Sequence, residues 1–180
     1  YGAGVNPDGS IGRKEGQKMA GPAERLDPVD EVIGKKHLTH FNFWDTPPTA
    51  QLIMGVNAIQ KCAEATRLGI PVTIFSDPRH YFSNNIFSMS SDELSQWPEQ
   101  LGFAALGDTK LMEEFGDIAR QEYLAIGIRG ALHPMADLAT EPRWARCNGT
   151  FGEDAQLAAK MLKPYILGFQ NGSKLNRSSV

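Results

Sequence analysis

The sequence predicts an α/β protein with a parallel sheet and about three β-α units. Short apolar segments that favour strands alternate along the chain with longer segments whose apolar residues recur at helical spacing. Their order is strand, helix, strand, helix, strand, helix, and a helix between two strands is the usual crossover of a parallel sheet. We therefore expect neighbouring parallel strands with the helices packed outside them.

Composition is ordinary for a globular domain. Of the 180 residues, 41% are hydrophobic and 22% are charged, and the net charge is −3. Lysine and arginine are scattered rather than clustered, so we expect no nucleic-acid partner. No apolar run approaches the roughly 20 residues that span a bilayer, and the first residues lack a signal-peptide pattern, so we expect no membrane partner and the localisation stays unknown. Cys62 and Cys147 make no disulfide framework and are expected to be free thiols.

The first residues, 1–34, are rich in glycine, proline and charge and have no apolar periodicity. This pattern predicts an irregular leader or a surface loop, separate from residues 35–180. Within it, Asp27 followed by proline allows a helical turn over 27–33.

The first β-α unit follows this segment. Residues 36–43 predict a short strand, and Thr46 followed by two prolines predicts the start of a helix that Gly69 ends. Between these two points the apolar residues recur at helical spacing, which predicts an amphipathic helix. The apolar residues of its inner face are Leu52, Val56, Ile59 and Ala63.

The second unit begins with residues 70–76, an apolar run with no solvated face, which favours a parallel strand buried on both sides. A loop over 78–100 follows, and loops of that length in compact domains are usually functional or mobile. Asp108 then predicts the cap of a helix that runs to Ala125 and ends at Gly127.

The third unit comprises a strand over 128–136, a polar stretch over 137–153 and a helix over 154–169 that Asn171 and Gly172 end. A closed eight-stranded barrel takes roughly 250 residues. If the fold is such a barrel, three units hold fewer than half of its strands.

Polar side chains follow the second and third predicted strands. Asp77 comes directly after the strand over 70–76, and the stretch after the third strand contains Arg146. Because the carboxyl ends of parallel strands meet at one edge, we expect these groups to line one pocket. A carboxylate accepts from two hydroxyls, a guanidinium donates to two oxygens, and an indole stacks on a sugar face, so the set suits a neutral polyhydroxylated ligand. The further members of this set are Arg79, His80, Glu141, Arg143 and Trp144.

Two other interpretations use the same residues. Asp77 could form a structural ion pair with Arg146 or Arg143 that ties two loops together. A metal site would need histidine ligands, but the four histidines show no helical pairing and we expect no metal. No glycine-rich phosphate loop precedes a helix, so we expect no nucleotide and no cofactor.

Two pairs of motifs carry a resemblance to a known family. Residues 68–72 (LGIPV) lead into 76–80 (SDPRH), and residues 141–146 (EPRWAR) lead into 150–154 (TFGED). In this arrangement the chain resembles the N-terminal barrel of glycoside hydrolase family 3. The resemblance implies that residues 35–180 are the first part of a TIM-type (β/α)8 barrel.

The family consists of retaining enzymes that act on β-glycosides, among them β-glucosidases, β-xylosidases, exo-glucanases and N-acetylglucosaminidases. In it, the residues that match Asp77 and Arg146 bind hydroxyls of the sugar whose bond is cleaved. The resemblance therefore implies a β-glycoside carbohydrate as substrate, with Asp77 and Arg146 as binding residues. The residues implied to support them are Arg79, His80, Arg143 and Trp144.

Retaining hydrolysis needs two carboxylates about 5 Å apart, a nucleophile and an acid/base. The family places both after the fourth strand, so the resemblance puts them beyond Val180 and we identify no catalytic residue here. We expect the remainder of the barrel and a following domain as partners, and the 180-residue chain alone to be inactive. The alternative is a non-catalytic, truncated half-barrel that at most binds sugar weakly.

Overall fold

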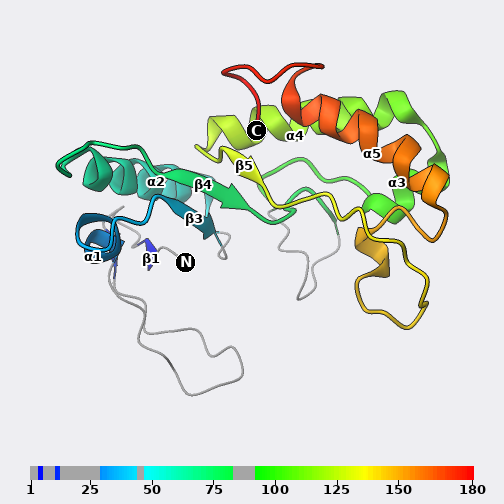
Figure 1. Ribbon diagram of the computed structural model, residues 1–180, viewed down its shortest axis with the longest axis horizontal. Helices are drawn as coiled ribbons and strands as arrows, with labels where there is room; N and C mark the ends of the chain where they lie inside the picture. Colours follow the sequence, from blue (N-terminus) through cyan, green and yellow to red (C-terminus); the bar gives the residue numbers. More distant parts are fainter. Residues whose placement is uncertain (1–3, 6–10, 13–28, 44–46, 83–91) are drawn as a thin grey trace. The chain divides into compact units, whose positions relative to one another are not determined.

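Figure 1 shows the computed structural model of the protein, which describes residues 4–5, 11–12, 29–43, 47–82 and 92–180. The chain forms two compact units, Tyr1–Phe75 and Ser76–Val180. A three-stranded parallel sheet confirms the predicted α/β class. Its strands, in spatial order, are β3 (His40–Phe43), β4 (Thr73–Ser76) and β5 (Gly130–Ala131).

The first unit contains α1 (Val29–Gly34), which occupies the described part of the helical turn expected over 27–33, and α2 (Thr49–Glu64). Helix α2 begins directly after Pro48, as the proline pair predicts; Thr46 lies outside the described residues. The inner residues expected for this helix, Leu52, Val56, Ile59 and Ala63, are all buried.

Strand β4 is anchored on both sides of its start. The Thr73 amide donates to the Thr39 carbonyl oxygen at 2.7 Å. The Gln60 side chain from α2 satisfies both backbone groups of Val72, because its Nε2 donates to the Val72 oxygen at 2.7 Å and its Oε1 accepts from the Val72 nitrogen at 3.0 Å. The backbone is thus fixed just before β4 carries the chain toward Asp77.

The leader also contains regular structure among its described residues. Strands β1 (Gly4–Val5) and β2 (Ile11–Gly12) pair antiparallel, with Gly4 opposite Gly12 and Val5 opposite Ile11. A domain boundary at residue 34 remains a prediction.

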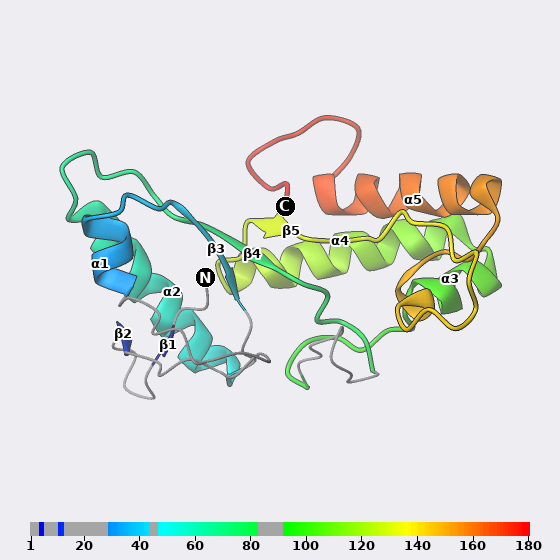
Figure 2. The same ribbon diagram turned by 60° about the horizontal axis from the view of Figure 1, so that its bottom comes forward.

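The second unit is built around α4 (Thr109–Ala125) and α5 (Ala155–Gln170), which run side by side in the same direction (Figures 1 and 2). The predicted cap at Asp108 is confirmed, and Asp154 caps α5 in the same way. Asp108 Oδ1 accepts from the amides of Lys110 at 2.9 Å and Leu111 at 3.1 Å, and Asp154 Oδ1 accepts from the Leu157 amide at 2.7 Å.

Two glycines let these helices approach closely. A Cβ atom at Gly168 would contact the Glu113 carbonyl oxygen and lie 2.7 Å from the Asp117 nitrogen, and one at Gly116 would lie 2.8 Å from the Tyr165 carbonyl oxygen. The backbones of α4 and α5 therefore meet where neither helix has a side chain.

Two elements differ from the expectation. Strand β5 has two residues where the sequence predicts a strand over 128–136, because Pro134 has no N–H to continue the ladder. Its last sheet contact is the Leu132 amide, which donates to the Ser76 carbonyl oxygen at 3.0 Å. A short helix, α3 (Gln100–Leu106), occupies a segment in which the sequence predicts no helix. Part of the predicted loop, 83–91, lies outside the described residues.

Candidate functional site

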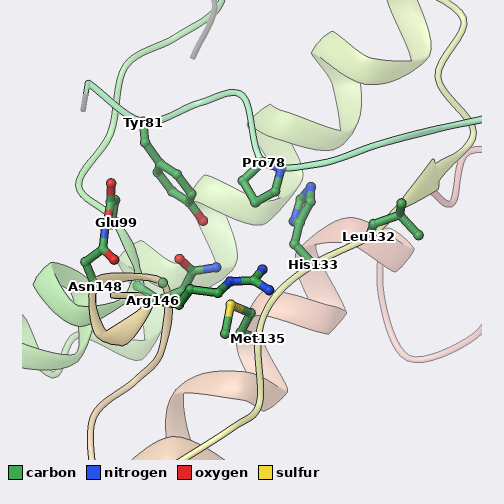
Figure 3. A pocket seen from close by; sticks show the side chains of 10 residues that line it. Pro78, Tyr81, Glu99, Leu132, His133, Met135, Arg146 and Asn148 are labelled. Atoms are coloured by element: carbon green, nitrogen blue, oxygen red, sulfur yellow. The ribbon is translucent and has the colours of Figure 1, made fainter. Parts of the chain in front are cut away.

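A pocket opens in the second unit beyond the carboxyl end of β4 (Figure 3). It holds about 390 Å³ of empty space, part of which is open to solvent. Four segments line it: the turn after β4, the start of α3, the chain after β5, and the 3₁₀ turn Cys147–Gly149. The lining residues are Pro78, Tyr81, Glu99, Gln100, Leu132, His133, Met135, Arg146, Asn148 and Gly149.

The two strand-end motifs meet at this pocket. Pro78, the residue after Asp77, lines it together with Arg146, and Figure 3 shows the Arg146 side chain extending across the middle of the pocket. Asp77 itself is half-buried directly after β4. The rule that polar groups gather at strand ends therefore led to both of these pocket-lining segments.

Two hydroxyl groups hold the backbone at Asp77 in place. Its carbonyl oxygen accepts from the Tyr123 hydroxyl of α4 and from the Ser76 hydroxyl, both at 2.9 Å. The Arg79 guanidinium, 1% exposed, donates to the Ser76 hydroxyl oxygen. Burial lowers the pKa of Arg79, and the nearby Tyr123 and Asp77 partly offset that effect. Arg79 therefore anchors the turn from inside rather than lining the pocket.

His80 anchors the same turn to α4. Its ring is 1% exposed, and its Nε2 lies 2.8 Å from Glu122 Oε2. Glu122 also accepts from the Ser95 hydroxyl at 2.9 Å, and the Ser95 oxygen in turn accepts from the Trp97 indole at 2.9 Å. Burial alone would raise the pKa of Glu122, but the hydrogen bonds from His80 and Ser95 outweigh burial and lower it. This network ties the turn after β4, α4 and the segment before α3 together.

A second buried network passes through His133. The Tyr123 hydroxyl donates to the Asp77 carbonyl, so it can only accept from His133 Nε2, 3.2 Å away. His133 Nε2 therefore carries the proton, and its Nδ1 accepts from the Tyr165 hydroxyl. Burial, together with the nearby charges of His80 and Arg79, lowers the pKa of His133 to about 3, which keeps the imidazole neutral.

Glu99 and Asn148 form the wall opposite His133 (Figure 3). The Asn148 amide donates to Glu99 Oε2. Burial raises the pKa of Glu99, and the bond from Asn148 partly opposes this. The pair places a fixed carboxylate at the start of α3.

Arg143 and Trp144, for which the resemblance implies a supporting role, both lie outside the pocket lining. Arg143 donates to both carboxylate oxygens of Glu141 at 2.8 Å, and 89% of its side chain is exposed. This bidentate pair lowers the pKa of Glu141 to about 2. Arg143 is thus engaged by Glu141, and neither it nor the half-buried Trp144 lines the pocket.

Among the lining residues, the sequence predicted Arg146 and the motif that contains Pro78. The lining residues that it did not predict are Tyr81, Glu99, Gln100, Leu132, His133, Met135, Asn148 and Gly149. Tyr81 adjoins the SDPRH motif, and Asn148 lies two residues after Arg146, so proximity to the motifs was an available signal. Glu99 and Gln100 follow a Trp-Pro pair, which is compatible with a helix start.

Three further features concern the cysteines, metal ligands and helices of the described residues. Cys62 and Cys147 are unbridged, as expected. Within the described ranges no three His, Cys, Asp or Glu side chains gather closely enough to hold a metal ion. None of the helices seen there is both long and apolar enough to cross a bilayer.

The parallel sheet, its outer helices and the pocket at the strand ends define the first part of a TIM-type β/α barrel. Residues 27–177 match the glycosyl hydrolase family 3 N-terminal domain, and the chain belongs to this family. The resemblance carried by the two motif pairs is thereby confirmed.

Relatives of this chain are glycoside hydrolases. Over 154 residues it is 52% identical to β-glucosidase C of Emericella nidulans, covering 84% of this chain and 25% of that protein. It is 46% identical to a periplasmic β-glucosidase/β-xylosidase of Dickeya chrysanthemi, covering 99% of this chain and 28% of that protein. The chain thus spans about a quarter of the length of these curated relatives.

Solved structures agree with this fold. A β-glucosidase involved in saponin metabolism from intestinal bacteria superposes with a TM-score of 0.69 at 27% identity, covering 86% of this chain and 19% of that one. A family 3 β-N-acetylglucosaminidase from Paenibacillus gives 0.70 at 20% identity, over 79% of this chain and 27% of that one, and shares the fold.

Proposed function

We propose that the chain is the N-terminal portion of a retaining β-glycosidase that hydrolyses O-glycosyl bonds, and that it carries part of the glycone-binding subsite. Asp77 and Arg146 bind the sugar in this proposal, and the nucleophile and acid/base belong to the part of the enzyme beyond Val180. The observation that carries it is the pocket lined jointly by Pro78, beside Asp77, and by Arg146.

The chemistry of this pair suits a neutral sugar. A carboxylate accepts hydrogen bonds from hydroxyl groups, and a guanidinium donates to hydroxyl oxygens. Together the two groups can therefore pair with both the donor and the acceptor function of sugar hydroxyls. Their opposite charges leave the pocket without a strong preference for an anion or a cation. The tethered Asp77 carbonyl and the buried Arg79 fix the backbone from which the carboxylate projects.

The test uses an enzyme that extends this chain through the whole barrel and the following domain, assayed on aryl β-glucosides and β-xylosides. Replacing Asp77 by Ala removes a charged acceptor, a loss of roughly 1.5–3 kcal/mol that grows if the contact tightens in the transition state. We expect kcat/KM to fall about tenfold to several hundredfold. Asp137→Ala, at an exposed aspartate outside the pocket lining, is the matched control.

Two outcomes would contradict the proposal. Wild-type kinetics in an Asp77→Ala enzyme of reduced melting temperature would identify Asp77 as a structural ion-pair partner. If the extended enzyme hydrolysed none of the aryl β-glycosides tried, a non-catalytic half-barrel would be favoured.

The proposal also predicts that residues 1–180 alone do not hydrolyse these substrates. Positioning groups without a nucleophile and an acid/base cannot lower the barrier by the required amount. Turnover by the short chain that disappears in Asp77→Ala would show that Asp77 is catalytic.

A further inference from the structure

A second hollow lies in the first unit, at the end where strands β3 and β4 begin (Figures 1 and 2). It holds about 710 Å³ of empty space, part of which is open to solvent, against about 390 Å³ in the pocket of Figure 3. Two turns line it, one from α1 to β3 and one from α2 to β4. We call this hollow the turn groove, and its lining residues are 33, 37–39, 66–68 and 70.

Aliphatic side chains make up half of the lining, and most of them are exposed. Leu38 is 40% exposed, Leu68 is 63% exposed and Ile70 is 50% exposed, while Ile33 is buried beside them. Ile70 opens the apolar run that the sequence predicts to be buried on both sides, yet it precedes β4 and lies at the surface. Exposed aliphatic side chains that gather in one hollow, rather than singly, indicate a binding site.

Hydrogen bonds hold both turns in place. The Leu38 amide donates to the Val32 carbonyl oxygen of α1 at 3.2 Å. In the other turn, the Thr66 hydroxyl donates to the Ala63 carbonyl oxygen at 2.7 Å, and the Gly69 amide donates to the Thr66 carbonyl oxygen at 3.2 Å. The two walls are therefore fixed by the fold, and the turn groove is already formed before a ligand binds.

The polar part of the lining offers a positive charge. The hydroxyls of Thr39 and Thr66 already have partners within the protein. Arg67 and His37 are exposed, and neither has a hydrogen-bond or ion-pair partner among the described residues. Because Arg67 is always charged and presents its donors in one plane, it can bind both oxygens of a carboxylate.

This combination favours one class of ligand. A cation would meet the Arg67 charge, and the described lining contains no carboxylate to offset it. The same lining has no indole or phenyl ring on which a sugar face could stack. An alkyl chain that ends in a carboxylate fits both parts, because the chain removes aliphatic surface from water and the head group pairs with the guanidinium.

We propose that the turn groove is a second binding site, for a medium-chain alkyl carboxylate. The chain lies against Leu38, Leu68 and Ile70, and the carboxylate accepts hydrogen bonds from Arg67. The turn groove shares no lining residue with the pocket of Figure 3. This inference therefore goes beyond the proposed function and does not rest on it.

The experiment measures binding to the extended enzyme by isothermal titration calorimetry, with hexanoate, heptanoate and octanoate as probes. Two further probes, 1-octanol and octylammonium, keep the eight-carbon chain and carry a neutral or a positive head group. The variants are Arg67→Gln, which removes the charge, and Leu68→Asn, which removes aliphatic surface. Their matched controls are Arg177→Gln and Leu175→Asn, at exposed positions outside the lining. Melting temperatures are recorded for all four variants.

We expect each CH₂ group added between hexanoate and octanoate to strengthen binding about twofold to fourfold. Octanoate should bind about threefold to tenfold more tightly than 1-octanol, and octylammonium should bind most weakly, because the Arg67 charge is exposed and partly screened. Arg67→Gln should remove the advantage of octanoate over 1-octanol and leave the affinity for 1-octanol unchanged. Leu68→Asn should weaken both probes by one factor, and the two controls should bind like wild type.

Three results would overturn the inference. If octanoate does not bind the extended enzyme, another part of the polypeptide covers the turn groove or the groove takes no ligand of this class. If 1-octanol binds as tightly as octanoate, or if affinity is independent of chain length, the ligand class is wrong. If Arg177→Gln weakens octanoate as much as Arg67→Gln does, binding occurs outside the groove. Glycoside hydrolysis takes no part in these measurements, so the proposed function stands or fails separately.

Discussion

The hydroxyl of Tyr123 donates to the backbone carbonyl oxygen of Asp77 at 2.9 Å, so helix α4 holds the end of β4 in place. The same hydroxyl accepts from His133 Nε2 at 3.2 Å. One side chain therefore joins the turn after β4 to the chain that follows β5.

Tyr123→Phe should lower the free energy of unfolding by about 1–3 kcal/mol, because it leaves buried groups of Asp77 and His133 without this partner. In the extended enzyme it should also lower kcat/KM, since Asp77 loses part of its support. Tyr165→Phe is the control, because it removes a bond to His133 and none to Asp77. Urea unfolding and steady-state kinetics check both effects, and equal kinetic losses in the two variants would refute the link to Asp77.

The pH dependence of stability should reveal His133. Its pKa is about 3 in the folded protein, against about 6.5 in an unfolded chain. Because the folded pKa is lower, the neutral form stabilises the fold fully above pH 6.5, and this contribution is lost as pH falls from about 6.5 toward 3. The slope is at most about 1.4 kcal/mol per pH unit.

His133→Asn cannot titrate, so its unfolding free energy should depend less on pH over that window. Nitrogen NMR of the wild-type ring should find a neutral Nε2–H tautomer at pH 5. A doubly protonated ring at that pH would contradict the deduced network.

Glu122→Gln should destabilise the segment around Ser95 by about 1 kcal/mol at neutral pH, a moderate figure because the side chain of Glu122 is 30% exposed. The pKa of Glu122 is lowered in the folded protein, so the stability from its charge is present above its ordinary pKa and lost as pH falls below it. The difference between wild type and variant should therefore shrink below about pH 4.5. Unfolding curves at several pH values check this, and a difference that does not shrink as the pH falls would contradict it.

Gly168→Ala should destabilise the second unit by roughly 1–3 kcal/mol, because the added Cβ would overlap the α4 backbone near Asp117. The matched control is Gly34→Ala at the end of α1, where an added Cβ meets nothing within 4 Å. Thermal unfolding of both variants should separate them. Equal melting temperatures would show that α4 and α5 can move apart at little cost.

The helices with local signals could be predicted from the sequence, and the elements that depend on distant contacts could not. Asp108 caps its own helix, so the signal and its effect lie within three residues. Strand β5 is short because Pro134 stops a ladder that pairs with Ser76, more than fifty residues earlier. Helix α3 carries Gly102 in its interior, which weakens any helical signal.

In the site, too, features with a local sequence signal could be predicted and features that depend on distant contacts could not. The rule that polar groups gather at strand ends led to the segments of Asp77 and Arg146. Arg79 and His80 belong to the same motif, but only their burial separates anchoring residues from pocket residues. Tyr123 lies on the inner face of α4, and its bond to Asp77 spans 46 positions, which no local pattern encodes.

If Asp77 binds the sugar as proposed, the tether between Tyr123 and Asp77 has a consequence for binding. The peptide group of Asp77 is immobilised when the protein folds, before any sugar arrives. Its conformational entropy is therefore already lost, and a sugar that engages the carboxylate need not order the backbone as well. Such preorganisation strengthens binding without adding a single contact to the ligand.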